Sequence, residues 1–195
     1  MKAIKRLRGI VGICLLGMVI MPGFCMGETP DCDRACLEGF VNLYLDALTA
    51  RDPGRLPLTR DARYTENGIA LVLGDGMWGP EIVLRDYRFY FADPRAGQVG
   101  FYGTLEEHGH PAILGLRLKV ERRRISEMEA FIIRSTARGT FSDVDNMLDI
   151  PLLTQALKPT QRRPRDELIR IANSYFEGMV AGTDAPIPFA AASCN

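Results

Sequence analysis

Apolar residues recur every three or four positions in the first well-patterned stretch of the chain. The members of this series are Cys36, Leu37, Phe40, Val41, Tyr44, Leu45 and Leu48. This spacing predicts an amphipathic helix with one buried face. Asp31 and Asp33 are suitable N-cap residues, and the helix should end near Arg51, because Asp52-Pro53-Gly54 follows. We expect residues 57–61 to be a short irregular stretch or a single turn.

The pattern then changes to the two-residue alternation of β-strands. Residues 63–66 and 69–73 flank Asn67-Gly68, a typical hairpin turn. Four longer strands are expected at 82–92, 98–107, 112–121 and 124–134, as an antiparallel meander. In the third, Leu114, Leu116, Leu118 and Val120 share one face. Half-buried antiparallel strands show this pattern. The predicted fold class is α+β: a curved antiparallel sheet wrapped by helices.

Residues 135–163 are weakly patterned, with a short helix expected at 149–157. Pro164 then opens a second predicted helix at 165–179. A shift of 131 residues aligns Asn42 with Asn173, Tyr44 with Tyr175 and Pro57 with Pro188. Either two amphipathic helices resemble one another by chance, or a second copy of the first unit begins near residue 165. A second copy would be a truncated domain or a returning helix kept as a lid.

The N-terminus has the features of a secretory signal peptide. Four basic residues precede residue 9, residues 10–21 are almost wholly apolar, and Cys25 and Gly27 are small residues suited to cleavage before Glu28. The apolar run is too short to span a bilayer, and the bulky Phe24 disfavours a lipid anchor on Cys25. We therefore expect a signal peptide at 1–27, a folded domain at 28–135, a connector at 136–163, and a C-terminal helix and tail at 164–195. The mature protein would be secreted or periplasmic.

Composition supports this division and narrows the partners. The chain has 195 residues, 47% of them hydrophobic, with 24 basic and 24 acidic side chains. These values exclude a coiled coil, a collagen repeat and long disorder. Removal of residues 1–27 leaves 20 basic against 24 acidic residues, a net charge of −4. Neither a nucleic acid nor, after signal removal, a membrane is therefore an expected partner.

Three cysteines remain in the predicted mature chain: Cys32, Cys36 and Cys194. In an oxidising compartment a structural disulfide is favoured over redox chemistry, since no C-x-x-C motif occurs. Cys32 and Cys36 can pair if Cys32 lies outside the regular helix, or Cys194 can tie the C-terminus to one of them. No metal site is expected.

The usual catalytic signatures are missing: there is no phosphate loop, no G-x-S-x-G and no H-E-x-x-H. His108-Gly109-His110 is best explained as a hairpin tip. The densest polar group surrounds the Asn-Gly turn and the Gly-Asp-Gly segment that follows. Tyr64, Glu66 and Trp78 could converge there as hydrogen-bonding, acid/base and stacking groups.

Several longer runs carry a resemblance to a known family. They are Cys36-Leu37-Glu38-Gly39-Phe40, Leu56-Pro57-Leu58, Tyr64-Thr65-Glu66-Asn67-Gly68, Gly74-Asp75-Gly76-Met77-Trp78, Tyr87-Arg88-Phe89-Tyr90 and Gly97-Gln98-Val99-Gly100-Phe101. Over about 31–134 the chain resembles secreted fungal and bacterial proteins of unknown function, which are similar to the nuclear transport factor 2-like (NTF2-like, SnoaL-like) cone superfamily. The resemblance implies a curved sheet wrapped by helices around a central, mostly apolar pocket. That superfamily contains cofactor-free lyases and isomerases as well as non-catalytic binding domains, so fold alone does not decide function.

Within that expected pocket, specific roles follow for individual residues. Glu66 or Asp75 would be the base, Tyr64 or Tyr87 the proton donor, and Arg134, at the end of an apolar face, the anion stabiliser. The substrate-binding candidates are Trp78, Tyr90, Tyr102, Leu116 and Ile132.

The sequence predicts a secreted protein with a ligand pocket, and the main hypothesis is a cofactor-independent acid/base lyase or isomerase. The reaction would be elimination, isomerisation or deformylation of a small aromatic or polycyclic molecule, with no cofactor. The alternative is a non-catalytic module for small-molecule binding or dimerisation, so a homodimer stays open.

Overall fold

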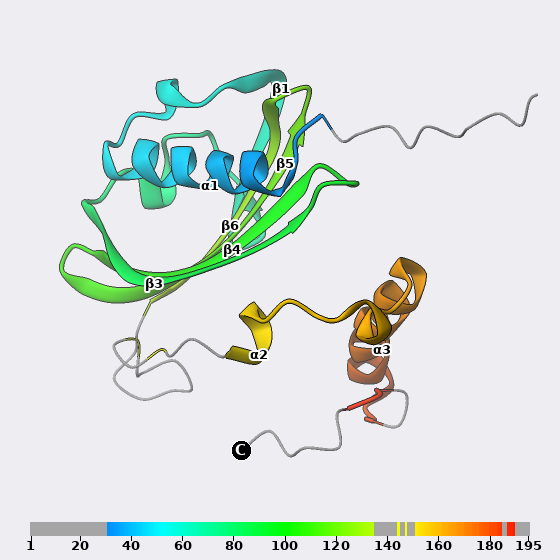
Figure 1. Cartoon of the computed structure of the whole chain (residues 1–195). Coiled ribbons are helices and arrows are strands. Elements are labelled where there is room, and N and C mark those ends of the chain that lie inside the picture. The colour runs from blue at the N-terminus through cyan, green and yellow to red at the C-terminus, as the bar shows by residue number, and fades with distance from the viewer. Residues whose placement is uncertain (1–30, 135–143, 145–146, 148–150, 185–186, 190–195) are drawn as a thin grey trace, which may run out of the picture. The chain divides into compact units, whose positions relative to one another are not determined.

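The computed structural model describes residues 31–134, 144, 147, 151–184 and 187–189 (Figure 1). The chain divides into two compact units, with the boundary between Ser135 and Thr136. The first unit contains helix α1 and a six-stranded sheet, and the second contains α2 and α3.

Helix α1 covers Arg34–Thr49 and confirms the first predicted helix. The Asp33 side chain caps it by accepting a 2.9 Å hydrogen bond from the Cys36 backbone N–H. Cys32 lies just before the helix and forms a disulfide with Cys36. One of the two pairings that the sequence left open is therefore present, while Cys194 lies outside the described residues.

The strands are β1 (Leu58–Glu66), β2 (Ile69–Ala70), β3 (Ile82–Asp93), β4 (Gln98–Glu107), β5 (His110–Glu121) and β6 (Arg124–Arg134). Their order in the sheet is β2-β1-β6-β5-β4-β3. The predicted meander is confirmed as β3 to β6. The expectation of a wholly antiparallel sheet is wrong at one place, because β1 runs parallel to β6. The chain crosses from β2 at one edge to β3 at the other, so no hairpin forces β1 and β6 into opposite directions.

Strand β1 is longer and β2 shorter than the sequence pattern predicts. Residues 58–61 belong to β1 rather than to an irregular stretch. Leu58 pairs with Ile125, and the register shifts between Leu58 and Arg63. This irregularity removes the regular alternation by which a strand is recognised. After Ala70 the chain leaves the sheet toward the short 3-10 helix η2 (Gly76–Trp78).

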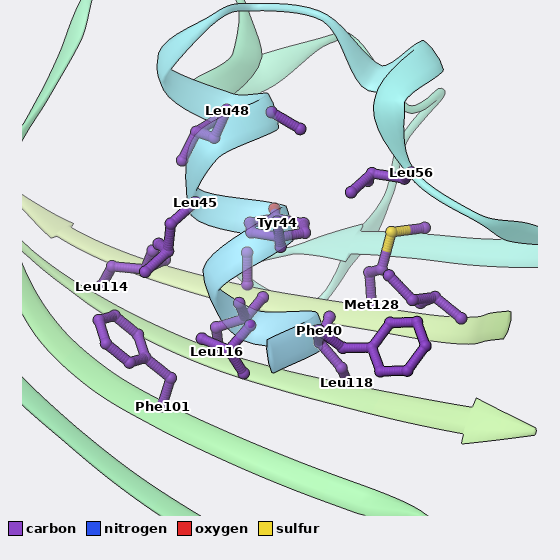
Figure 2. Packing of buried hydrophobic residues seen from close by; sticks show 14 of the residues in the cluster. Phe40, Tyr44, Leu45, Leu48, Leu56, Phe101, Leu114, Leu116, Leu118 and Met128 are labelled. Atoms are coloured by element: carbon purple, nitrogen blue, oxygen red, sulfur yellow. The ribbon is translucent and has the colours of Figure 1, made fainter. Parts of the chain in front are cut away.

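The core lies between α1 and the concave face of the sheet. Figure 2 shows Phe40, Tyr44, Leu45 and Leu48 of α1 above Leu114, Leu116, Leu118 and Met128 of β5 and β6. Across β5 and β6, Leu114, Leu116 and Leu118 pair with Ile132, Ala130 and Met128. All six are buried. The α+β class with a curved sheet is therefore shown, with the sheet mixed rather than antiparallel.

The second unit contains α2 (Pro151–Thr154), η4 (Pro159–Gln161) and α3 (Arg165–Ala181). The helix expected at 149–157 is only four residues long, whereas the one expected at 165–179 is confirmed. Leu168, Tyr175, Phe176 and Met179 of α3 are half or more exposed. With the 131-residue shift they correspond to Leu37, Tyr44, Leu45 and Leu48, which α1 buries. The repeat itself stays a prediction.

None of the helices in the described residues has the length and apolar character required to cross a membrane.

Candidate functional site

Tyr64 and Glu66 lie on the concave face, at the end of β1. They are two residues apart on one strand, so their side chains share a face. Both residues are buried, at 4% and 8% exposure. The Tyr64 hydroxyl donates a 2.9 Å hydrogen bond to Glu66 Oε2, and the Met77 backbone N–H donates a 2.8 Å bond to the same oxygen. The carboxylate thus joins β1 to η2.

The Gly74-Asp75-Gly76 segment folds closely around this carboxylate. Gly76 has a φ of +65°, and a Cβ at this position would overlap the Glu66 carboxylate. Glycine is therefore required for both conformation and space. The next two residues, Met77 and Trp78, are buried. The Trp78 ring packs edge-on against Tyr44, with ring centroids 5.2 Å apart.

Arg134 closes the outer side of the group. Its Nη2 lies 3.9 Å from Glu66 Oε1. The same guanidinium donates to both carboxylate oxygens of Glu107, through Nε to Oε2 and through Nη2 at 2.7 Å to Oε1. The Arg134 side chain is 51% exposed, whereas that of Glu66 is 10% exposed. The hydrogen bond from Arg134 lowers the pKa of Glu107, although partial burial of this carboxyl acts against it.

Two tyrosines of the group are held in their neutral form. Burial raises the pKa of Tyr44 and the pKa of Tyr64 well above the ordinary value, and the nearby Glu66 carboxylate adds to both shifts. Both phenols therefore keep their protons throughout the neutral range. The Tyr44 Oη and Trp78 Nε1 lie close enough to influence each other, yet neither has a partner in hydrogen-bond geometry among the described residues.

We call these six residues the Glu66 cluster: Tyr44, Tyr64, Glu66, Trp78, Glu107 and Arg134. The sequence indicated four of them and missed two. Tyr44 was missed because its spacing makes it one of the regularly repeated core positions of α1. Glu107 lies an even number of residues from Val99, Phe101 and Leu105, the inward-facing residues of β4. This alternation was the sequence signal that could have placed Glu107 on the concave face.

The structure separates other candidates from this cluster. Asp75 is exposed at the N-terminus of η2 and makes no side-chain capping bond. Tyr87 and Tyr102 pack against each other on the convex face, with ring centroids 6.3 Å apart. Neither can therefore meet Glu66, which lies on the concave side.

The remaining candidates are packing residues on the concave side. Tyr90 contacts Phe101 and donates a 2.7 Å hydrogen bond to Asn42 Oδ1 on α1. Leu116 and Ile132 are buried in the core. Trp78 is 2% exposed and its ring packs on Tyr44. A substrate therefore cannot stack on the ring, and the indole N–H is the group that could contact one.

Two depressions lined by described residues lie elsewhere. One, of about 520 Å³, is lined by Thr59, Arg60, Glu121, Arg122 and Arg124. The other, of about 270 Å³, is lined by Arg63, Thr65, Arg117, Glu127, Met128 and Glu129. No residue of the Glu66 cluster lines either one. The described part of the chain also holds no group of three or more His, Cys, Asp or Glu placed to bind a metal ion.

Comparison with known proteins gives structural neighbours only. No family model matches the chain, and no curated protein matches its sequence. Among solved structures, an NTF2-like protein of unknown function from Cytophaga hutchinsonii is 10% identical, with a TM-score of 0.40 over 50% of this chain and 89% of that one. A Kribbella flavida protein provisionally described as a ketosteroid isomerase is 13% identical, with a TM-score of 0.40 over 58% and 88%.

A third neighbour is an LEH-like epoxide hydrolase from M. tuberculosis, 17% identical, with a TM-score of 0.34 over 49% of this chain and 80% of that one. The matches thus include NTF2-like proteins, the group that the sequence resembles. At such identities the likeness concerns the fold and assigns no activity.

Proposed function

We propose that the chain is a cofactor-independent lyase or isomerase in which Glu66 is the proton-transferring base. The observation that carries this proposal is the convergence of Tyr64, Glu66 and Arg134 on one side of the sheet. The substrate class is a small aromatic or polycyclic molecule with an enolisable or eliminable proton. A buried carboxylate beside a guanidinium suits such chemistry, because one group takes the proton and the other stabilises the resulting anion.

The hydrogen bonds divide the roles between the two Glu66 oxygens. Oε2 already accepts from Tyr64 and Met77, whereas Oε1 faces Arg134. Oε1 would take a proton from a substrate carbon, and the electron pair left behind would move onto the substrate oxygen. In an isomerisation Glu66 would return the proton to a second carbon. Tyr64, kept protonated, would hold the carboxylate in place.

Arg134 can stabilise that oxygen without leaving Glu107. The pair with Glu107 uses Nε and one hydrogen of Nη2, so Nη1 still has donors. Tyr44, which interacts with Tyr64 and Glu66, and Trp78, which packs on Tyr44, add two buried donors. A buried polar atom without a partner costs free energy, so two together favour a site that receives a polar group.

We also propose that the protein acts outside the cytoplasm, in the periplasm or as a secreted protein. The basic and then apolar start of the sequence supports this. The Cys32–Cys36 disulfide does so too, because disulfides persist in oxidising compartments.

The decisive experiment is hydrogen exchange at carbon. The protein is incubated in D₂O with a panel of aromatic ketones and lignin-type aromatic dimers, and deuterium uptake is followed by NMR and mass spectrometry. We expect uptake above the solvent rate with at least one member, and a loss of about 100-fold or more in Glu66→Gln. Glu129→Gln is the matched control, because this carboxylate pairs with Arg117 on the opposite face. Equal rates for Glu66→Gln and the unaltered protein, or no uptake with any member, would refute the proposal.

A second candidate function, homodimerisation, is favoured by one specific observation on the convex face. Val83, Phe91 and Phe131 are 49%, 54% and 48% exposed. Phe131, Gly115, Tyr102 and Phe89 also lie in one row across four strands. An exposed apolar sheet face is typical of association surfaces. Sedimentation of the unaltered protein and of Phe91→Ser/Phe131→Ser tests this candidate: a dimer that the double substitution dissociates supports it, and a monomer in both rejects it.

A further inference from the structure

The hairpin between β5 and β6 breaks the rule that the other tight hairpins follow. Asn67-Gly68 and His108-Gly109 join their strands with positive φ at both residues, 49° and 80° in the first and 51° and 75° in the second. Arg122 and Arg123 adopt the same kind of turn, with φ of 51° and 57°, but without a glycine. Two consecutive arginines in the left-handed region cost free energy that Asn-Gly would not. A locally unfavourable choice of this kind points to a function of the side chains.

This turn forms one wall of the 520 Å³ depression described above. Thr59 and Arg60 of β1 form the other wall, and Arg124 lies at the start of β6. We call this depression the arginine cleft. Three guanidinium groups and a threonine hydroxyl line it, with Arg123 directly adjacent in sequence. Donors of this kind recognise planar or tetrahedral oxyanions through paired N–H groups.

The positive charge of the arginine cleft is not neutralised by the protein. Within residues 31–134, no ion pair involves Arg60, Arg122 or Arg123, and Arg124 Nη1 donates only to the Leu58 backbone oxygen, at 3.3 Å. Glu121 is the one carboxylate that lines the cleft, and it pairs with Lys119 at 3.1 Å. The hydrogen bond from Lys119 lowers the pKa of Glu121, so this carboxylate stays charged.

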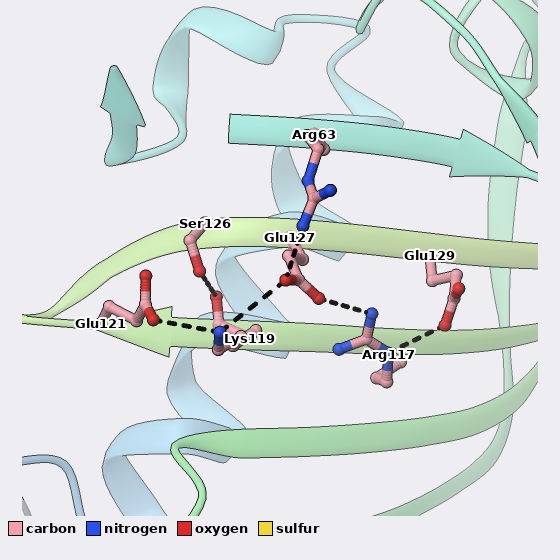
Figure 3. A network of polar contacts seen from close by, with 7 residues as sticks. All are labelled: Arg63, Arg117, Lys119, Glu121, Ser126, Glu127 and Glu129. Atoms are coloured by element: carbon pink, nitrogen blue, oxygen red, sulfur yellow. Dashed lines mark hydrogen bonds and ion pairs between the residues drawn. The ribbon is translucent and has the colours of Figure 1, made fainter. Parts of the chain in front are cut away.

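The neighbouring basic residues of the convex face provide a contrast. Figure 3 shows Glu127 between Arg63, Arg117 and Lys119, with Glu129 on Arg117 and Glu121 on Lys119. In that network every basic residue has a carboxylate partner. The three guanidinium groups that line the arginine cleft therefore lack the carboxylate partners that Arg63, Arg117 and Lys119 have.

We propose that the arginine cleft is a binding site for a small oxyanion with two or more negative charges, carried by phosphate or sulfate groups. Arg60, Arg122 and Arg124 bind the charged oxygens from three directions, and the Thr59 hydroxyl donates to one of them. The strained turn places Arg122 and Arg123 at the rim. The site is separate from the Glu66 cluster, with which it shares no residue.

The test is calorimetric titration of the protein with inorganic pyrophosphate and, in a second arm, with sucrose octasulfate. The two arms distinguish a phosphate from a sulfate source. We expect binding that weakens as NaCl is raised from 20 to 150 mM, since the contacts are exposed ion pairs. In Arg122→Asn/Arg123→Gly the affinity should fall at least tenfold. The same double substitution should raise the thermal midpoint by several degrees, because it restores the favoured turn residues.

Arg95→Gln is the matched control, since Arg95 is an exposed arginine in the turn between β3 and β4. It should change the affinity by less than twofold. Arg60→Gln, on β1, should weaken binding without altering the turn. An equal loss of affinity in Arg95→Gln would mean that net charge alone explains the binding, and would overturn the proposal. Retained affinity in the double variant would overturn it too, as would the absence of binding at millimolar concentrations in both arms. Deuterium uptake at carbon should be unchanged in the double variant.

Discussion

The Tyr64 hydroxyl donates to Glu66 Oε2 at 2.9 Å, on the buried face of a strand that both residues share. The same oxygen also accepts from the Met77 backbone N–H, and this second bond links the end of β1 to the Gly76–Trp78 segment. A buried carboxylate needs such donors, since a charge taken out of water is costly when its lone pairs are unmatched.

Tyr64→Phe should therefore destabilise the protein although the ring can still pack. Removal of a hydrogen bond to a buried charged group costs about 1.5–3 kcal/mol. Urea denaturation measures this loss, with Tyr175→Phe as the control, because Tyr175 is 50% exposed on α3. Equal unfolding free energies for Tyr64→Phe and the unaltered protein would show that the bond contributes nothing.

Alkaline titration should reveal the two buried tyrosines of the Glu66 cluster, Tyr44 and Tyr64. Burial raises the pKa of Tyr44 and of Tyr64 in the folded protein, whereas both groups ionise near pH 10 when unfolded. Above that pH the folded state holds more protons than the unfolded state, so stability falls as pH rises. Absorbance at 295 nm should show that these two tyrosines ionise only as the protein unfolds. In Tyr64→Phe one of the late-titrating groups should disappear. Ionisation of Tyr44 and Tyr64 before unfolding would show the assignment to be wrong.

Much of the first unit could be predicted from its sequence, because most of its hairpins carry a local turn signal. Asn67-Gly68 marks its own turn, and the alternation of Leu114, Leu116 and Leu118 with charged residues identifies β5 and its buried face. The parallel pairing of β1 with β6 has no such signal, since it depends on where a long connection returns. The first half of β1 is hidden for a different reason: alternation of side chains is lost where the register shifts, between Leu58 and Arg63.

The site was predictable where side chains are close in sequence and less so where strands bring them together. Tyr64 and Glu66 share a face by spacing alone. Tyr87 was predicted as an alternative proton donor, but it packs on Tyr102 on the other face of the sheet. The register shift between Leu84 and Arg88 affects the strand around it. Glu107 is found only when β4, β5 and β6 are aligned so that its carboxylate meets Arg134.

The Glu107–Arg134 pair should make stability depend weakly on pH in the acid range. The pKa of Glu107 is lowered in the folded protein, mainly by the hydrogen bond from Arg134. Its stabilisation is present above the unfolded pKa, near 4.3, and is lost as pH falls through the lower folded value. Because Arg134 is half exposed, we expect less than about 1 kcal/mol. Urea midpoints from pH 6 to pH 3 should therefore fall less steeply in Glu107→Gln than in the unaltered protein.

Glu81→Gln is the control for this measurement, since Glu81 is exposed and its side chain has no ion pair among the described residues. It should leave the slope unchanged. Addition of 1 M NaCl should reduce the difference between Glu107→Gln and the unaltered protein, because salt screens a partly exposed pair. A slope in Glu107→Gln identical to that of the unaltered protein would mean that the pair does not set the acid response.

Gly76 and Gly68 provide a matched test of how closely the chain folds around Glu66. Both have positive φ, +65° and +80°, so alanine at either position costs about 1–2 kcal/mol from backbone strain alone. A Cβ on Gly68 meets nothing within 4 Å, whereas one on Gly76 would overlap the Glu66 carboxylate. Gly76→Ala should therefore destabilise the protein by about 1–3 kcal/mol more than Gly68→Ala, the usual cost of overpacking. In a Glu66→Ala background most of that excess should vanish, because the carboxylate is gone and only Leu71 Cδ1, at 3.0 Å, stays close to the new Cβ. Urea denaturation of the five variants measures it, and equal costs for the two glycines would show that the Gly76 segment does not pack on Glu66.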